Sequence, residues 1–330
     1  MRCVLPFYRL GATAAQVVFF VFYCLAFRLA RQSQADWVIT AAQLPDPSGE
    51  ESEMVTRLDY GLALTSNSKV GWAFSLPRNK TCIGATNLCK RLCYGNGIRY
   101  QSEAQKNKRE RNFRTIELLL SEGGPELLAE NLVMMLDQAR PRDWLTARVT
   151  GCATVVPWSI RIHDLGDFFE SIDYVRAWIL AAKSRPGCAL WFYTRSFEND
   201  GLLAALSELA SLRNCQGWLS VDSNNYAAAI LAKCKTTPGV WKLAILQDRD
   251  FDPEVLVGII GSVGNSAIDS SKNKSASGEV VSFPYHHGGR HVVPLRHKGL
   301  TVCPAVTGAY KLQTDIGLPR PCQSCAFCLP

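Results

Sequence analysis

The grouping of its cysteines is the feature that most constrains this 330-residue chain. Of its 13 cysteines, seven fall into two tight groups, and the others are scattered among apolar residues, where a small buried thiol is the ordinary role. An odd number argues against a closed set of disulfides, and so does the grouping, because disulfide frameworks spread along a chain. We therefore expect a reducing, cytoplasmic compartment and predict that both groups bind metal.

The N-terminal cysteine group consists of Cys82, Cys89 and Cys93, with six and then three residues between them. These cysteines lie in the segment TCIGATNLCKRLCYG, which reads as a loop. Three thiolates can hold a 4Fe-4S cluster and leave one iron open to an added ligand, an arrangement that suits chemistry at the cluster. We therefore predict an open iron-sulfur site in this loop.

The C-terminal cysteine group consists of Cys303, Cys322, Cys325 and Cys328. Four thiolates can complete either a second 4Fe-4S cluster or a tetrahedral zinc site. The tight C-x2-C-x2-C run favours iron-sulfur, because zinc ribbons usually pair two separated C-x2-C arms. Zinc is the alternative metal for both groups, and one site shared by the two groups is a further alternative.

Apolar runs alternate with helical patterns from Leu58 onward, which is typical of repeated βα units around a parallel sheet. The predicted strands are 144–150, 159–165, 189–194, 217–222, 240–246 and 279–285. The predicted helices are 101–120, 124–139, 170–184, 199–212, 224–233 and 253–261. This pattern predicts an α/β fold, a partial or complete TIM-like (βα) barrel with a cysteine-rich C-terminal segment. An open doubly wound sheet is the alternative, without a Gly-x-Gly-x-x-Gly dinucleotide motif after any strand.

The chain divides by composition into three parts. Residues 1–53 hold an apolar run at 11–30 and a polar linker; residues 54–300 form the barrel-like domain with the cysteine loop 82–93; and residues 301–330 form the C-terminal cysteine segment. The apolar run is near the lower limit for spanning a bilayer. Three interpretations stay open: a mis-set start with Met54 as the true first residue, a membrane anchor, or a packed or interfacial helix.

Polar residues follow several predicted strands, where the carboxyl ends of parallel strands usually carry the chemistry. His163 and Asp167 follow one strand, Arg195 the next, and Asp222 and Asn224 the third. We predict that Asp167, Arg195 and His163 form a catalytic group, with Arg195 binding a carboxylate or phosphate in a bidentate manner. Asp167, Arg195, Asp222 and Asn224 are the candidates for holding a cofactor or substrate. Helix capping is the alternative role for the aspartates and for Asn224.

Segment 80–114 has the steepest charge asymmetry in a chain whose net charge is +7. Its basic residues are Lys80, Lys90, Arg91, Arg99, Lys106, Lys108, Arg109, Arg111 and Arg114. Basic side chains interleaved with aromatic ones suit a phosphate backbone, so nucleic acid is a candidate partner. A solvated basic helix is the alternative.

Three stretches, 65–95, 161–196 and the terminal CQSCAFC, resemble the gene product 88 family of phages and plasmids. The resemblance runs from about residue 60 to residue 330 and favours Met54 as the start. A more distant similarity is to radical S-adenosylmethionine enzymes, which share the order of a cysteine-tyrosine loop, a strand with a Gly-Asp end and a strand ending in Thr-Arg. In those enzymes the loop spacing is three then two, with an aromatic residue before the last cysteine, whereas here Tyr94 follows it.

The distant similarity implies specific roles for both groups. The N-terminal group would bind a 4Fe-4S cluster whose open iron chelates S-adenosylmethionine, with Asp167 near the methionine amino group. The C-terminal group would hold an auxiliary cluster served by an electron donor. The expected function is one-electron chemistry on an unknown substrate, with nucleic acid as a candidate. The alternative is a non-catalytic, metal-stabilised nucleic-acid-binding protein, with a membrane partner only if 11–30 is an anchor.

Overall fold

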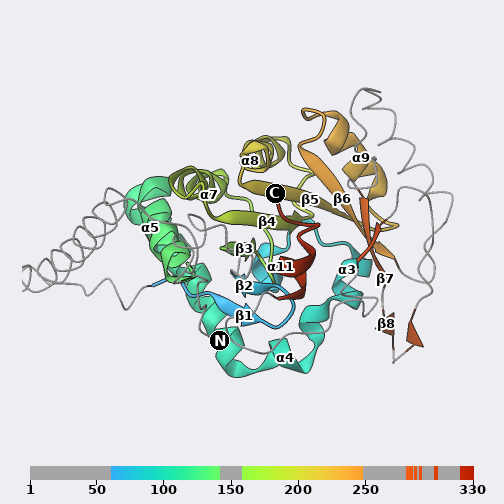
Figure 1. The fold of residues 1–330 in the computed structure, drawn as a ribbon, viewed down its shortest axis with the longest axis horizontal. Helices are drawn as coiled ribbons and strands as arrows, with labels where there is room; N and C mark the ends of the chain where they lie inside the picture. The colour runs from blue at the N-terminus through green and yellow to red at the C-terminus, as the bar shows by residue number, and fades with distance from the viewer. Residues whose placement is uncertain are drawn as a thin grey trace, which may run out of the picture. The chain divides into compact units, whose positions relative to one another are not determined.

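The structure is a computed structural model (Figure 1). It describes residues 61–141, 158–247, 280–284, 286–287, 290–291, 301–303 and 320–330. The predictions for residues 1–53, for a strand at 144–150 and for a helix at 253–261 lie outside these residues. Within them, no helix has the length and apolarity needed to cross a membrane.

The fold is built on one eight-stranded sheet. Its strands in spatial order are β1 (Thr65–Asn67), β2 (Gly71–Ala73), β3 (Ser159–Ile162), β4 (Ala189–Thr194), β5 (Cys215–Val221), β6 (Trp241–Gln247), β7 (Val280–Pro284) and β10 (Thr301–Val302). β1 and β2 form an antiparallel hairpin, and every other neighbouring pair is parallel. Two short strands, β8 (His286–His287) and β9 (Arg290–His291), form a separate antiparallel pair.

Four longer helices connect or follow these strands. They are α5 (Glu103–Gln138), α7 (Ile172–Ser184), α8 (Asp200–Ser211) and α9 (Tyr226–Cys234). Ser171 caps α7 by accepting from the Tyr174 N–H, and Asn199 caps α8 by accepting from the Leu202 N–H, because short polar side chains satisfy the free amides of a first turn. The short helices are α2 (Arg78–Thr81), α3 (Asn87–Leu92), the 3₁₀ helix η1 (Tyr94–Asn96), α4 (Ile98–Gln101) and α11 (Pro321–Cys325).

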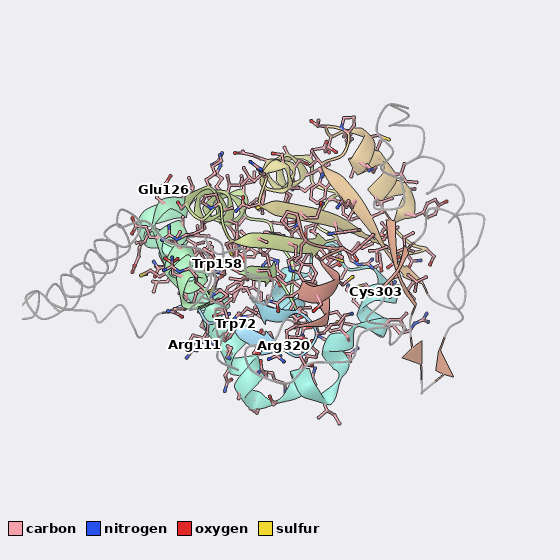
Figure 2. The ribbon with its side chains drawn as sticks, in the orientation of Figure 1. Trp72, Arg111, Glu126, Trp158, Cys303 and Arg320 are labelled. Carbon is pink, nitrogen blue, oxygen red and sulfur yellow. The ribbon has the colours of Figure 1, made fainter. Side chains whose placement is uncertain are left out.

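A break divides α5 into two halves. Gly123 and Gly124 leave helical geometry there, and Gly124 adopts a positive φ of 66°, which glycine tolerates without strain. Pro125 then begins the second half, where its missing N–H costs no hydrogen bond. Figure 2 labels Arg111 on the first half and Glu126 on the second. This break agrees with the two separate helices predicted at 101–120 and 124–139.

The two faces of the sheet are buried by different parts of the chain. In β4, Leu190 and Phe192 pack into the main core with the helices, whereas Trp191 and Tyr193 point to the opposite face. On that face Trp191 and Tyr193 meet Cys322, Cys328 and Leu329 of the C-terminal segment. Successive side chains of a strand point to opposite faces. This alternation places the longer helices on one side of the sheet and the C-terminal segment with α11 on the other (Figure 1).

The structure confirms an α/β fold with a mainly parallel sheet. The predicted strand at 189–194 is found residue for residue, and four others are found with ends shifted by a few residues. A complete barrel is wrong, because the sheet as described has two free edges, β1 and β10. Strands β2 to β7 follow one another in chain order, without the reversal that defines a doubly wound sheet.

Candidate metal centres

The N-terminal cysteine group lies in the connection between β2 and α5. Cys82 ends α2, Cys93 ends α3, and Cys89 lies within α3. Thr86 caps α3 by accepting a hydrogen bond of 3.0 Å from the Cys89 N–H. A short helix with an exposed polar face can begin there because Thr is a good first-turn cap. The cap fixes where Cys89 stands relative to the other two cysteines.

The three thiols of this group lie near enough to affect one another's ionisation. Burial is the main cause that raises the pKa of Cys82 and of Cys89 above its ordinary value, and the other thiols of the group raise it further. Cys82 is affected by Cys89 and Cys93, and Cys89 by Cys93, so each pair is close enough to interact electrostatically. All three are free thiols. In the described part of the chain, no group of three or more Cys, His, Asp or Glu side chains is arranged to hold a metal ion.

An ion pair at the ends of β4 and β5 holds the cysteine loop. Arg195 Nη1 lies 2.5 Å from Asp222 Oδ2, and both side chains are almost completely buried. The same Asp222 oxygen accepts a 2.6 Å hydrogen bond from Thr86 Oγ1. At Gly84, a methyl group would collide with the Arg195 carbonyl oxygen, so the loop backbone lies directly against the end of β4. The polar residues predicted at strand ends therefore meet the cysteine loop.

Asp167 lies at the end of β3 beside this pair. Its carboxylate accepts 2.7 Å hydrogen bonds from the backbone N–H groups of Arg195 and Phe168, and its own N–H donates to Thr81 Oγ1, next to Cys82. Burial nevertheless raises the pKa of Asp167 to about 6. Its negative charge is the second cause of the raised pKa of Cys82. Asp167, Arg195 and Asp222 thus form one polar group under the N-terminal cysteines.

Two predicted site residues lie elsewhere. His163 has a positive φ of 60°, and its ring lies in the helix-side core against Phe168, with Nε2 2.7 Å from the Tyr174 hydroxyl oxygen. Burial lowers the pKa of His163 to about 3, so its imidazole is neutral there. Asn224 has an exposed side chain, and its backbone N–H donates to Asp222 Oδ1. The structure does not bring His163 or the Asn224 side chain to the cysteine loop.

The C-terminal cysteine group lies on the other face of the sheet. Cys303 and Cys328 pack with Trp218 of β5, and Cys322 packs near Trp191 of β4. Cys328 interacts electrostatically with the three other thiols of the group. Burial raises the pKa of Cys322 to about 11 and that of Cys328 to about 12. All four thiols are free and gathered within one locality.

Backbone and side-chain contacts fasten this group to the sheet. The Cys322 N–H donates to the Lys69 carbonyl oxygen, and buried Gln323 donates to Ser159 Oγ over 3.2 Å. The Trp218 indole N–H donates to the Cys328 carbonyl oxygen over 3.2 Å. Ala326 turns the chain with a φ of 55°, so that Cys328 returns toward the sheet after α11. The C-terminal segment is therefore a packed layer of the fold.

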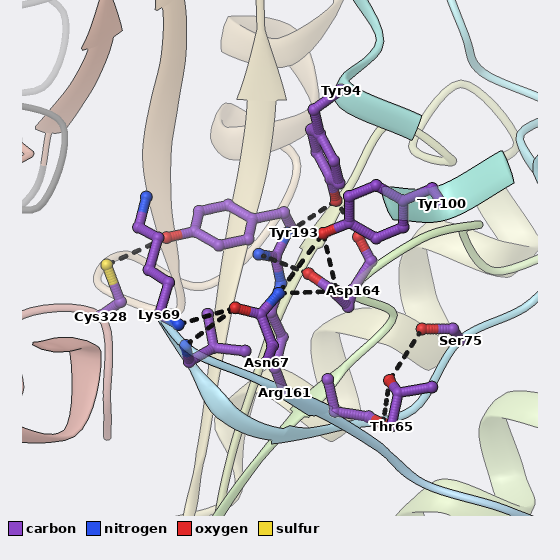
Figure 3. A network of polar contacts seen from close by, with 12 residues as sticks. Thr65, Asn67, Lys69, Ser75, Tyr94, Tyr100, Arg161, Asp164, Tyr193 and Cys328 are labelled. Atoms are coloured by element: carbon purple, nitrogen blue, oxygen red, sulfur yellow. Dashed lines mark hydrogen bonds and ion pairs between the residues drawn. The ribbon is translucent and has the colours of Figure 1, made fainter. Parts of the chain in front are cut away.

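A polar network on the sheet face opposite the main core connects the surroundings of the N-terminal and C-terminal cysteine groups (Figure 3). The Tyr193 hydroxyl donates to Cys328 Sγ over 3.0 Å. The Arg161 guanidinium lies 4.9 Å from the Tyr193 ring centre and donates to the hydroxyl of Tyr94, which follows Cys93. Asp164 pairs with Arg161 and accepts from Tyr100 and from Asn67. Contacts thus run without interruption from Cys328 to the residue after Cys93.

Several residues around the two cysteine groups were not predicted from the sequence. Thr86 could have been found, because a threonine before a short polar helix is a capping signal. Tyr193 and Gln323 carry no such signal, since their partners Cys328 and Ser159 lie far away in the sequence, and Arg161 gives no signal of its contacts with Tyr94 and Tyr193. The alternation within β3 and β4 would only have assigned Arg161 and Tyr193 to the face that the main core does not use.

The basic segment 80–114 includes the cysteine loop and the first turns of α5. Glu110 pairs with Lys80 at 2.5 Å and with Arg114 at 3.5 Å, and Glu103 pairs with Lys106 at 2.9 Å. Lys90, Arg91 and Arg111 are exposed, whereas Arg109 is buried. The segment is thus partly an ion-paired helix surface and partly a set of exposed cations.

Comparison with known proteins places the chain in a family. A family model described as gene product 88 matches residues 48–329, which is most of the chain. Searches of curated proteins and of solved structures gave no match. These comparisons confirm the resemblance that the sequence indicated and give no support to the more distant similarity to radical S-adenosylmethionine enzymes. The chain belongs to the gene product 88 family.

Proposed function

We propose that this chain is an iron-sulfur protein in which the N-terminal cysteine group binds a cluster with one open iron. The observation that supports this most is that three free thiols, close enough to affect one another's ionisation, lie in a loop held against Arg195 and Asp222 at the ends of β4 and β5. Ligand sites of parallel α/β folds lie at the carboxyl ends of strands. We also interpret the sheet, with strands β2 to β7 in chain order and helices over one face, as a partial (βα) barrel.

Three thiols are the donor set of a four-iron cluster with one open iron. Without a metal, burial keeps the thiols of Cys82 and Cys89 protonated, so a strong positive charge is needed to ionise them. The thiols of Cys82, Cys89 and Cys93 affect one another's ionisation, so they are near enough to be proposed together as ligands of one cluster. A bound cluster would supply one-electron chemistry.

The polar group beneath the cysteines has two roles in this proposal. Arg195 and Asp222 position the cysteine loop through Thr86, because the three are bonded to one another. Asp167, next to Thr81 and Cys82, is the residue that would meet an amino or hydroxyl group of a ligand on the open iron. S-adenosylmethionine is the chelating ligand that we propose.

The C-terminal cysteine group would hold a second, closed cluster. Four gathered thiols complete the coordination of a cluster, and the hydrogen bond from Tyr193 to Cys328 stabilises charge on one of them. The network of Figure 3 supports an electron-relay role, because Tyr193 and Arg161 connect Cys328 with Tyr94. An external electron donor would reduce this cluster first.

The test is the metal content of cysteine variants purified without oxygen. A Cys82→Ala, Cys89→Ala, Cys93→Ala variant should lose about half of the iron and sulfide and keep the spectrum of the second cluster. Cys234→Ala, an exposed cysteine outside both groups, is the control and should keep all of it. Unchanged iron in the triple variant, or zinc in place of iron, would contradict the proposal.

A second measurement tests the proposed ligand. Reduced, cluster-loaded protein is incubated with S-adenosylmethionine and a candidate substrate. The sulfonium takes up one electron and its carbon-sulfur bond breaks, which gives methionine and, after hydrogen abstraction from substrate, 5′-deoxyadenosine. Formation of 5′-deoxyadenosine that requires Cys82, Cys89 and Cys93 supports the enzyme. Intact clusters without this product would leave the non-catalytic alternative.

A further inference from the structure

A cavity of about 280 Å³ opens beside the cysteine loop, on the side of α5. Its wall is formed by the residues before Cys82, the turn after Cys93, the end of β3 and the first turns of α5. The lining includes Arg78, Gly95, Gln101, Lys106, Arg109 and Leu165. The cavity is therefore lined by the segments that flank the cysteine loop on both sides.

The charges around this cavity are mostly positive. Arg78, Lys106 and Arg109 line it, and Glu110 is the acidic lining residue. The Glu110 carboxylate is engaged by Lys80 at 2.5 Å and by Arg114 at 3.5 Å, both from outside the lining. The Glu110 charge is thus largely compensated from outside the cavity. Lys106 is likewise paired with Glu103 at 2.9 Å, so the excess positive charge comes from Arg78 and Arg109.

The two arginines of the cavity have only neutral acceptors among the described residues. Arg109, with 6% of its surface exposed, donates over 2.7 Å to the Tyr100 carbonyl oxygen. Arg78 donates over 2.5 Å to the side-chain oxygen of Asn96. A buried guanidinium is costly unless an anion compensates it, and its planar donor fork matches the oxygens of a phosphate.

We propose that this cavity binds a phosphate group of a nucleotide or of a nucleic-acid strand. Exposed Lys90, Arg91 and Arg111 belong to the same basic segment and would meet the neighbouring phosphates of a strand. The cavity would place the rest of such a ligand near the N-terminal cysteine group, because Gly95 lies between Leu165 and Cys93 Sγ. The inference goes beyond the proposed iron-sulfur function and does not require it.

The test compares matched charge-removing variants of the full chain. The probe is a fluorescent single-stranded oligonucleotide, competed with adenosine monophosphate, adenosine or inorganic phosphate. Arg78→Gln and Lys106→Gln should each weaken binding about tenfold, since a hydrogen bond to a charged group is lost. The controls are Arg176→Gln and Lys235→Gln. Lys235 pairs with Asp200 at 2.8 Å and is as exposed as Lys106 in its pair with Glu103.

The outcomes separate the sources of the phosphate and the two proposals. If adenosine monophosphate competes with the oligonucleotide and adenosine does not, the cavity binds the phosphate of a free nucleotide. If the oligonucleotide binds and adenosine monophosphate does not compete, the cavity binds the phosphate of a nucleic-acid strand. Equal weakening in the cavity variants and the controls, or equal competition by adenosine, overturns the inference. Binding that persists in the Cys82→Ala, Cys89→Ala, Cys93→Ala variant shows that the cavity acts independently of the metal.

Discussion

Tyr193 is the residue through which the sheet acts directly on a cysteine of the C-terminal group. Its hydroxyl donates to Cys328 Sγ, and its ring packs beside Arg161. A hydrogen bond to a ligand sulfur stabilises the more negative, reduced form of a cluster. Tyr193→Phe removes the donor and keeps the ring.

If the C-terminal group holds the cluster that we propose, the Tyr193→Phe variant should lower its reduction potential. We expect a shift of about 50 mV, the electrical equivalent of one ordinary hydrogen bond for a one-electron couple. Spin-resonance redox titration measures it, and Tyr226→Phe, on α9, serves as the control. An unchanged potential would show that the tyrosine acts on packing alone.

His163 makes stability depend on pH. Its folded-state pKa is lowered from 6.5 to about 3 by burial, so the unfolded chain binds a proton that the folded chain does not. The stabilisation is complete above pH 6.5 and falls by about 1.4 kcal/mol per pH unit as the pH drops toward 3. His163→Asn, which tolerates the positive φ, should flatten this slope in urea titrations of metal-free protein. A slope that survives the substitution would assign the pH dependence to other groups.

The sequence predicted where the residues of the candidate site lie, but not which residues they contact. Asp167, Arg195 and Asp222 stand where the strand-end rule placed them, yet Arg195 is bound by Asp222, a pairing across 27 residues that no local pattern encodes. His163 points inward because its positive φ redirects the side chain, and a backbone angle cannot be read from the spacing of apolar residues. Their predicted roles toward a ligand stay predictions.

At the scale of elements, the cysteine loop depends on a close approach between Gly84 and the end of β4. A methyl group there would meet the Arg195 carbonyl oxygen, which belongs to the backbone and cannot move aside. Gly84→Ala should therefore displace the loop, reduce iron at the N-terminal group and destabilise the fold by about 2 kcal/mol or more.

The matched control is Gly201→Ala in α8. Its added methyl group would meet nothing closer than 3.4 Å, and alanine favours helix over glycine. It should leave iron content unchanged and stability equal or slightly higher in urea unfolding. If Gly84→Ala behaves like Gly201→Ala, the loop does not depend on this contact.

Elements with a strong periodic pattern were predicted well, and short ones were missed. The strand 189–194 is a continuous apolar run, and α7 and α8 begin after capping residues that the sequence displays. β1 and β2 have three residues each and are rich in Ser, Asn and Gly, so no pattern marks them. The short helix α11 could not be predicted, because it is stabilised by packing against Trp191 of the sheet and not by a pattern in its own five residues.

At the scale of the whole molecule, the C-terminal segment acts as the cover of one sheet face. Trp191 and Trp218 are buried on that face, with Cys322, Phe327, Cys328 and Leu329 of the segment packed on them. Removing residues 320–330 should lower the free energy of unfolding by more than about 3 kcal/mol even in metal-free protein, because apolar surface becomes exposed.

Urea unfolding followed by tryptophan fluorescence measures this loss. Deletion of the exposed Pro330 alone is the control and should change little. If the longer truncation unfolds at the same urea concentration as the full chain, the segment is held by metal alone and the packing adds no stability.

We propose two iron-sulfur clusters in this protein. The N-terminal cysteine group would hold one at the carboxyl ends of the strands, and the C-terminal group would hold the other on the sheet face opposite the main core. The most direct measurement is the iron, zinc and acid-labile sulfide content of the wild-type chain purified without oxygen. The proposal predicts about eight iron and eight sulfide per chain for two 4Fe-4S clusters. Stoichiometric zinc with no sulfide, or neither metal, would contradict it.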